Sequence, residues 1–91
     1  MVPKIKKIGM PKMDKAQLNW ACRRGMLELD LVLERFMKAG YDSLTNTQKV
    51  DFEQLLGCQD QDLWRWFLQS EQPSDPKLAA LVTLILQRVH L

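Results

Sequence analysis

The chain has 91 residues, of which 46% are hydrophobic, and carries a formal net charge of +2. This length provides one small domain, and the hydrophobic share is enough for a compact helical core without cross-links. No run approaches the roughly 20 apolar residues that span a bilayer, so membrane insertion is not expected. The first residues also lack the continuous apolar stretch of a secretory signal.

The charge is divided unevenly along the chain. Residues 1–13 contain four lysines and no acid, while all 11 acids lie in residues 14–91. A basic arm on a mildly acidic body lacks the broad positive field of a nucleic-acid-binding protein. We therefore predict a flexible basic arm over 1–13, a folded domain over 14–91, a cytoplasmic location and no nucleic-acid partner.

The first two predicted helices meet at Gly25. Asp14 caps the first helix, and Gln17 three residues later completes a capping-box pattern. Gly25 is expected to end or bend this helix, because glycine has no side chain and permits sharp turns. The second helix runs from about Met26 to Ala39, where apolar residues recur at three- and four-residue steps, and Gly40 stops it.

The middle of the chain predicts two further helices. Thr45 and Gln48 form a second capping box ahead of a helix near 46–56, which Gly57 closes. Asp60 is expected to cap a short fourth helix, whose apolar residues fit two different faces. One tryptophan of that helix is therefore expected to lie partly exposed. These apolar residues are Leu63, Trp64, Trp66, Phe67 and Leu68.

Two of the helices have wide apolar faces. Leu27 and Leu31 widen the stripe of the second helix, which predicts that it is covered on two sides. Asp75 as a cap and Pro76 at the first helical position start a fifth helix that is apolar almost all round, so it should be central. Its main face carries Leu78, Leu81, Val82, Ile85 and Val89. An all-α, compact, single-domain five-helix bundle is predicted.

Residues that could carry chemistry are scarce. The one histidine, His90, stands next to the last residue, where it is rarely held rigidly enough for general-base catalysis. Cys22 and Cys58 have no CxxC partner and no histidine at ligand spacing, so a zinc site is not expected. They are interpreted as free thiols packed as small hydrophobic side chains in a reducing cytosol, and the sequence leaves a disulfide as the alternative. No glycine-rich phosphate loop is present. The chain is therefore predicted to bind no metal and not to be an enzyme.

Arg23, Arg24, Gly25 and Glu28 form the group that best suggests a binding site. In one interpretation, Gly25 is a junction glycine beside a surface ion pair between Arg24 and Glu28, which contributes at most about 1 kcal/mol. In the other, Gly25 makes room for the backbone of a partner, and the flanking charges supply oriented hydrogen bonds. The residues alone leave both interpretations open.

The segment Trp20–Asp30, with the sequence WACRRGMLELD, resembles the signature of the succinate dehydrogenase flavinylation factors. These are the bacterial SdhE-type FAD assembly factors, which are related to the mitochondrial succinate dehydrogenase assembly factor. Their RGxxE motif matches Arg24, Gly25 and Glu28, and the resemblance covers about residues 14–89. Further matching stretches are Tyr41-Asp42-Ser43-Leu44, Leu55-Leu56, Asp60-x-Asp62-Leu63-x-x-Trp66, and Pro73 ahead of the last helix.

The resemblance implies a small bacterial assembly factor that binds the flavoprotein subunit of succinate dehydrogenase, and of fumarate reductase. Such a factor promotes covalent attachment of FAD to a histidine of that subunit, holds no FAD stably itself, and is expected to be a monomer. The residues that would bind the partner are Arg23, Arg24, Gly25, Glu28 and Asp30. Trp66 is a further candidate, because an exposed tryptophan ring can anchor an interface.

Two other functions are compatible with parts of the sequence. A catalytic flavin transferase would have to hold FAD itself, which the lack of a phosphate loop disfavours. A small regulatory binding module, antitoxin-like or nucleic-acid binding, would rely on the basic residues 1–12, and the acidic body disfavours it. The basic arm and Leu27, where some bacterial relatives have a polar residue, depart from the family pattern.

Overall fold

A computed structural model describes residues 10–89, and within them every regular element is helical, which confirms the predicted all-α five-helix fold. Residues 1–9 of the predicted arm, and His90, lie outside the described residues. The elements are α1 (Lys15–Ala21), α2 (Leu27–Ala39), the short 3₁₀-helix η2 (Tyr41–Ser43), α3 (Asn46–Leu56), α4 (Asp60–Leu68) and α5 (Pro76–Val89).

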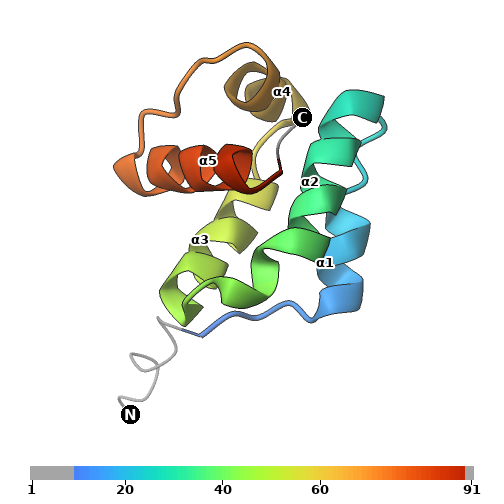
Figure 1. The fold of residues 1–91 in the computed structure, drawn as a ribbon, viewed down its shortest axis with the longest axis vertical. Coiled ribbons are helices and arrows are strands. Elements are labelled where there is room, and N and C mark those ends of the chain that lie inside the picture. The colour runs from blue at the N-terminus through green and yellow to red at the C-terminus, as the bar shows by residue number, and fades with distance from the viewer. Residues whose placement is uncertain (1–9, 90–91) are drawn as a thin grey trace.

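Helix α5 is the centre of the packing, as its composition predicts. It contacts α2, α3 and α4, and Figure 1 shows it crossing the bundle with its last turn directed towards α2. The five residues of its predicted face are all buried. Beneath it, the rings of Phe36 and Phe52 lie 5.4 Å apart between centroids, and Tyr41 lies 5.7 Å from Phe52. These aromatic contacts join α2, η2 and α3 into one core.

The predicted helix starts are confirmed by hydrogen bonds. The Asp14 carboxylate accepts the Gln17 N–H at 2.8 Å, and the Gln17 side chain accepts the Asp14 N–H at 2.9 Å. Thr45 and Gln48 form the same reciprocal pair at the start of α3. At the other end, α2 stops at Gly40 as predicted. These local signals fix where the helices begin and end.

Two predicted boundaries are wrong, and both corrections involve the same part of the molecule. Helix α1 ends at Ala21, four residues before Gly25, so Gly25 belongs to the connection that enters α2. Helix α4 is preceded by Gln59 as its N-cap, and Asp60 is its first helical residue rather than its cap. The Asp60 carboxylate accepts a hydrogen bond from Arg24 instead.

Helix α2 contacts both α4 and α5, so the prediction of two flanking neighbours is confirmed, but the two leucines expected to widen its buried face are exposed. Leu27 is 75% exposed and Leu31 is 37% exposed. The reason is length: α1 has 7 residues and α2 has 13, so α1 spans about half of α2 at a rise of roughly 1.5 Å per residue. Figure 1 shows the N-terminal turns of α2 extending beyond the end of α1.

Candidate partner-binding surface

Gly25 lies in the exposed connection between α1 and α2. Its backbone has φ +83°, in the left-handed region that L-residues with a side chain rarely adopt. A Cβ atom built at this position would meet no atom within 4 Å apart from those of the two adjacent residues. The backbone is therefore bare on its outer side, and the glycine is needed for its conformation rather than for packing within this chain. Such a position allows another backbone to approach closely.

The Arg24 side chain points back into the bundle. Its Nε donates to Asp60 Oδ1 at 2.7 Å, and its Nη2 donates to the Cys58 carbonyl at 2.8 Å. Its Nη1 donates to the carbonyls of Ala21 at 2.9 Å and Leu56 at 2.7 Å. The side chain is only 14% exposed. The interpretation in which Arg24 forms an ion pair with Glu28 is therefore wrong, because the guanidinium is committed to Asp60 and three carbonyl groups.

Asp30 holds the backbone of the same connection. Its Oδ1 accepts the Arg24 N–H at 2.8 Å, and its Oδ2 accepts the Gly25 N–H at 3.2 Å. Because one carboxylate binds two successive amides, it restricts the path of the chain immediately before α2. The half-buried Asp30 side chain is thus directed towards the backbone of the connection rather than towards a partner.

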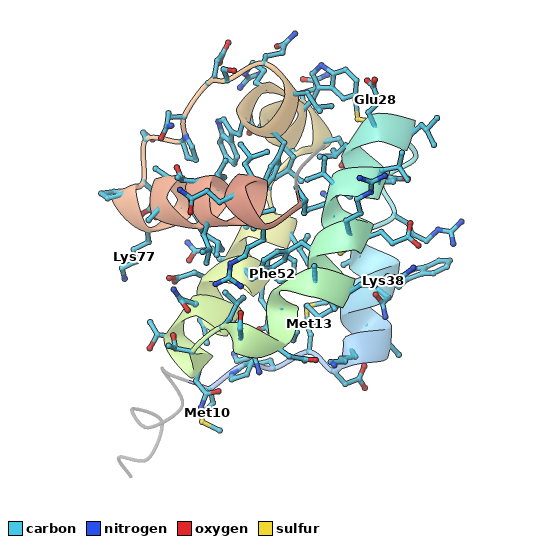
Figure 2. The ribbon with its side chains drawn as sticks, in the orientation of Figure 1. Met10, Met13, Glu28, Lys38, Phe52 and Lys77 are labelled. Carbon is cyan, nitrogen blue, oxygen red and sulfur yellow. The ribbon has the colours of Figure 1, made fainter. Side chains whose placement is uncertain are left out.

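Glu28 and Arg23 are exposed on either side of Gly25. Figure 2 shows Glu28 at the N-terminal end of α2, on the outer edge of the bundle. A carboxylate in the first turn of a helix is favoured by the helix dipole, and this one remains available to hydrogen-bond donors from outside. Of the predicted site residues, the exposed ones are Arg23, Gly25 and Glu28, and the structure places Arg24 and Asp30 behind them.

The sequence interpretation did not identify two large apolar side chains as surface residues. Trp20 is 78% exposed on α1, and Leu27 is 75% exposed at the start of α2. Helical periodicity could have identified both, because each stands two positions from a fully buried leucine, Leu18 or Leu29. Two residues correspond to roughly 200° around a helix, which is the opposite face. Large exposed side chains of this kind are common anchors of protein interfaces.

Trp66 lies elsewhere, on α4. It is half-buried and packs against the core, as does Trp64, so the predicted partial exposure applies to both rings. The structure does not place Trp66 in the connection that contains Gly25. Its assignment to the partner-binding surface remains a prediction.

A shallow groove of about 390 Å³ runs between α1 and α2 beside this connection. Its lining residues are Asn19, Cys22, Arg23, Asp30, Glu34 and Lys38. Burial raises the pKa of the Cys22 thiol to about 12, with the nearby Arg24 charge opposing the effect and the carboxylates of Asp30 and Glu34 adding to it. The thiol is therefore protonated at neutral pH and is a poor nucleophile.

The arrangement as a whole is suited to binding rather than to bond-making. Cys22 and Cys58 are both unpaired thiols, as interpreted from their sequence contexts. Among residues 10–89, no three histidine, cysteine or acidic side chains come together in a way that could hold a metal ion. In the same part of the chain, no helix combines the length and the hydropathy needed to cross a membrane. What the connection offers is bare backbone, exposed charge and exposed apolar surface.

Comparison with known proteins identifies the family. Residues 16–89 match the family described as flavinator of succinate dehydrogenase. The FAD assembly factor SdhE of Colwellia psychrerythraea is 49% identical over 78 residues, which are 86% of this chain and 86% of that protein. The proteins of the same name from Idiomarina loihiensis and Mannheimia succiniciproducens are 46% and 44% identical, covering 84% and 87% of this chain and 84% and 92% of their own lengths.

No solved structure matches the fold significantly. The sequence relationship is nevertheless sufficient, because the family match covers most of the chain and the three relatives exceed 40% identity over 84–92% of their own lengths. This agrees with the resemblance carried by the segment Trp20–Asp30 and by RGxxE. The chain belongs to the flavinator of succinate dehydrogenase family.

Proposed function

We propose that this protein binds the flavoprotein subunit of succinate dehydrogenase through the surface around Gly25 and promotes covalent attachment of FAD to that subunit. Membership of the flavinator family and the name of its relatives, FAD assembly factor, support this role. The family consists of assembly factors rather than enzymes. We extend the proposal to the flavoprotein subunit of fumarate reductase, and to a monomeric factor that acts in the bacterial cytoplasm without holding FAD stably.

The observation that carries the proposal is the conformation of Gly25. A left-handed glycine with open space beyond its Cα serves no packing purpose inside this chain. The same position is the glycine of the RGxxE motif. Close approach by a partner backbone would use the bare surface, and Glu28 and Arg23 would orient it through charge-assisted hydrogen bonds. Leu27 and Trp20 supply exposed apolar area for the same contact.

The mechanism is conformational. Covalent flavinylation requires the reactive carbon of the flavin to be held against the target histidine, and positioning can lower such a barrier by several kcal/mol, with about 7–11 kcal/mol as the upper range. Neither thiol of the described residues is a strong nucleophile, because burial raises the pKa of Cys22 to about 12 and also raises the pKa of the partly buried Cys58. The contribution of this chain would be to bind the attachment-competent arrangement of the flavoprotein more tightly than the others, which increases the population of that arrangement.

The first experiment measures covalent flavin by in-gel fluorescence of the denatured flavoprotein subunit, co-expressed with this chain in a host that lacks its own factor. We expect the wild-type chain to restore fluorescence and Glu28→Ala to reduce it strongly. Glu34→Ala is the matched control, since it removes another exposed carboxylate from α2. Equal fluorescence with and without the wild-type chain would refute the proposed function.

Substitutions of Gly25 separate steric blocking from backbone strain. Gly25→Arg is expected to cost about 1–2 kcal/mol of stability from its left-handed backbone, yet to keep the helical circular dichroism spectrum and abolish flavinylation. Gly25→Asn also adds a side chain, but asparagine tolerates this conformation better. Loss of flavinylation in both variants, with both folded, would show that the bare backbone matters. Full activity of folded Gly25→Arg would exclude close approach at this position.

A further inference from the structure

Arg24 links three separate parts of the chain by hydrogen bonds. The acceptors are the last residue of α1, the end of α3 with the turn that follows it, and the first residue of α4. Ala21 and Leu56 are C-terminal helix residues, whose carbonyl groups lack partners within their helices and carry partial negative charge. The guanidinium therefore caps the C-terminal ends of two helices and pairs with the first turn of a third.

The donor inventory leaves Arg24 little capacity for a partner. A guanidinium has five N–H donors. The one on Nε, both on Nη1 and one on Nη2 are used within the chain, at donor–acceptor distances of 2.7–2.9 Å. A bidentate bond from Arg24 to another protein would require some of these bonds to break. The arginine of the RGxxE motif is thus occupied internally, whereas its glycine and glutamate are exposed.

Asp30 completes the support from the other side of the backbone. Its two carboxylate oxygens accept the N–H groups of Arg24 and Gly25, so residue 24 is held through both its side chain and its main chain. The next residue is Gly25, whose left-handed φ directs the chain into α2. The conformation of the exposed glycine is in this way fixed by groups up to 36 residues away in the sequence.

We infer that Arg24, Asp30 and Asp60 are positioning residues that hold the partner-binding surface in its binding conformation, while the exposed Arg23, Gly25 and Glu28 make the contact. This inference rests on the proposed function and assigns a role to Asp60, which is outside the RGxxE motif. A surface held in place before binding avoids the entropy cost of ordering it during binding. Removing Asp60 should therefore weaken binding through Arg24.

The test is a double-mutant cycle with isothermal titration calorimetry, using the purified flavoprotein subunit from a host that lacks its own factor. Asp60→Ala and Arg24→Ala are each expected to weaken binding about tenfold. The double variant should bind no more than about twofold more weakly than either single variant. Asp60→Asn keeps an oxygen acceptor for Arg24 Nε and should retain most of the affinity. Arg24→Lys keeps the charge but cannot reach the four acceptors, and it should resemble Arg24→Ala.

General loss of stability is controlled by Thr45→Ala. Thr45 caps α3 at the end of the molecule opposite the N-terminal turns of α2, and its removal should leave binding within about twofold. Amide hydrogen exchange provides a readout that needs no partner. In Asp60→Ala, the amides of Arg24 and Gly25 should exchange faster relative to the core, whereas in Thr45→Ala they should not.

The outcomes distinguish this inference from the proposed function. If the wild-type chain does not bind the flavoprotein subunit, both are overturned. This inference alone is overturned if the wild type binds, Asp60→Ala keeps an affinity within about twofold of the wild type, and Arg24→Ala weakens binding more than Arg24→Lys does, as a direct charge contact would predict. Additive losses at Arg24 and Asp60 would likewise show two independent contacts and overturn it.

Discussion

The carboxylate of Glu53 on α3 accepts the backbone N–H of Met13 at 2.7 Å, and it also accepts the N–H of Lys12 through both oxygens at 2.8 and 3.0 Å. The chain ahead of α1 is therefore tied to α3, a helix about 40 residues later in the sequence. Residues 12 and 13 fall within the predicted arm over 1–13, yet their backbone is bound to the folded domain.

Glu53→Gln should release this segment. The charged acceptor is lost while the size of the side chain is kept, so the free energy of unfolding should fall by about 1 kcal/mol, as expected for a partly exposed charge-assisted bond. The check is urea unfolding together with hydrogen exchange of the Met13 amide, which should become faster. Asp51→Asn, also on α3, is the control, since its carboxylate accepts no bond from residues 10–14. An unchanged Met13 amide in Glu53→Gln would contradict the assignment.

Gly40→Ala should destabilise the protein through the core. A Cβ atom at Gly40 would stand 2.6 Å from Phe36 Cε1 and 3.0 Å from Cδ1, and the Phe36 ring is fully buried against Phe52. Because the ring must shift within a packed core, we expect a loss of about 1–3 kcal/mol in the free energy of unfolding. Thermal unfolding measures it directly.

Gly57→Ala is the matched control for this substitution. Gly57 is also a helix C-cap, but its φ of −80° suits any residue, and its nearest contact would be the Gln54 carbonyl oxygen at 3.3 Å. The expected change is within about 0.5 kcal/mol. A loss for Gly40→Ala no larger than the small change expected of Gly57→Ala would show that the Phe36 ring relaxes freely.

Leu29→Ala should lower stability, whereas Leu27→Ala should weaken binding. Leu29 is fully buried, so its truncation should lower the free energy of unfolding by about 2–5 kcal/mol. Leu27 is 75% exposed, and its truncation should change that free energy by less than about 0.5 kcal/mol. Under the proposed function, Leu27→Ala should instead weaken binding to the flavoprotein subunit by about 1 kcal/mol or more. If calorimetric titration gives Leu27→Ala the affinity of the wild type, Leu27 is not part of the binding surface.

Cys22 should make the protein less stable at alkaline pH. Its pKa rises from 9.0 to about 12 on folding, chiefly because the thiol is buried. The unfolded chain therefore loses this proton first, and the contribution of Cys22 to stability is full below about pH 9 and is lost as the pH rises towards 12. The slope is at most about 1.4 kcal/mol per pH unit.

The measurement compares urea unfolding of the wild type and Cys22→Ala between about pH 8 and about pH 10.5. The stability advantage of the wild type should shrink as the pH rises. Burial also raises the pKa of Tyr41, but that residue is common to both proteins and its effect cancels in the difference. A difference that does not vary with pH would show that Cys22 ionises normally in the folded state.

The sequence by itself determined the features that depend on neighbouring residues. Both capping boxes, the start of α5 at Pro76 and the stop of α2 at Gly40 are set by groups within a few positions of one another, so their spacing can be read directly. The buried face of α5 follows from helical periodicity in the same way. The family signature, carried by residues 20–30, is likewise a property of the linear chain.

Only the tertiary structure decided how the residues of the RGxxE motif divide their roles. The spacing of Arg24 and Glu28 allowed a local ion pair, but packing brought the ends of α1 and α3 and the start of α4 around Arg24 instead. The guanidinium binds where several carbonyl groups and a carboxylate converge, and three of its four acceptors stand 32 to 36 residues away. No local pattern encodes that convergence, because it exists only once the helices have packed.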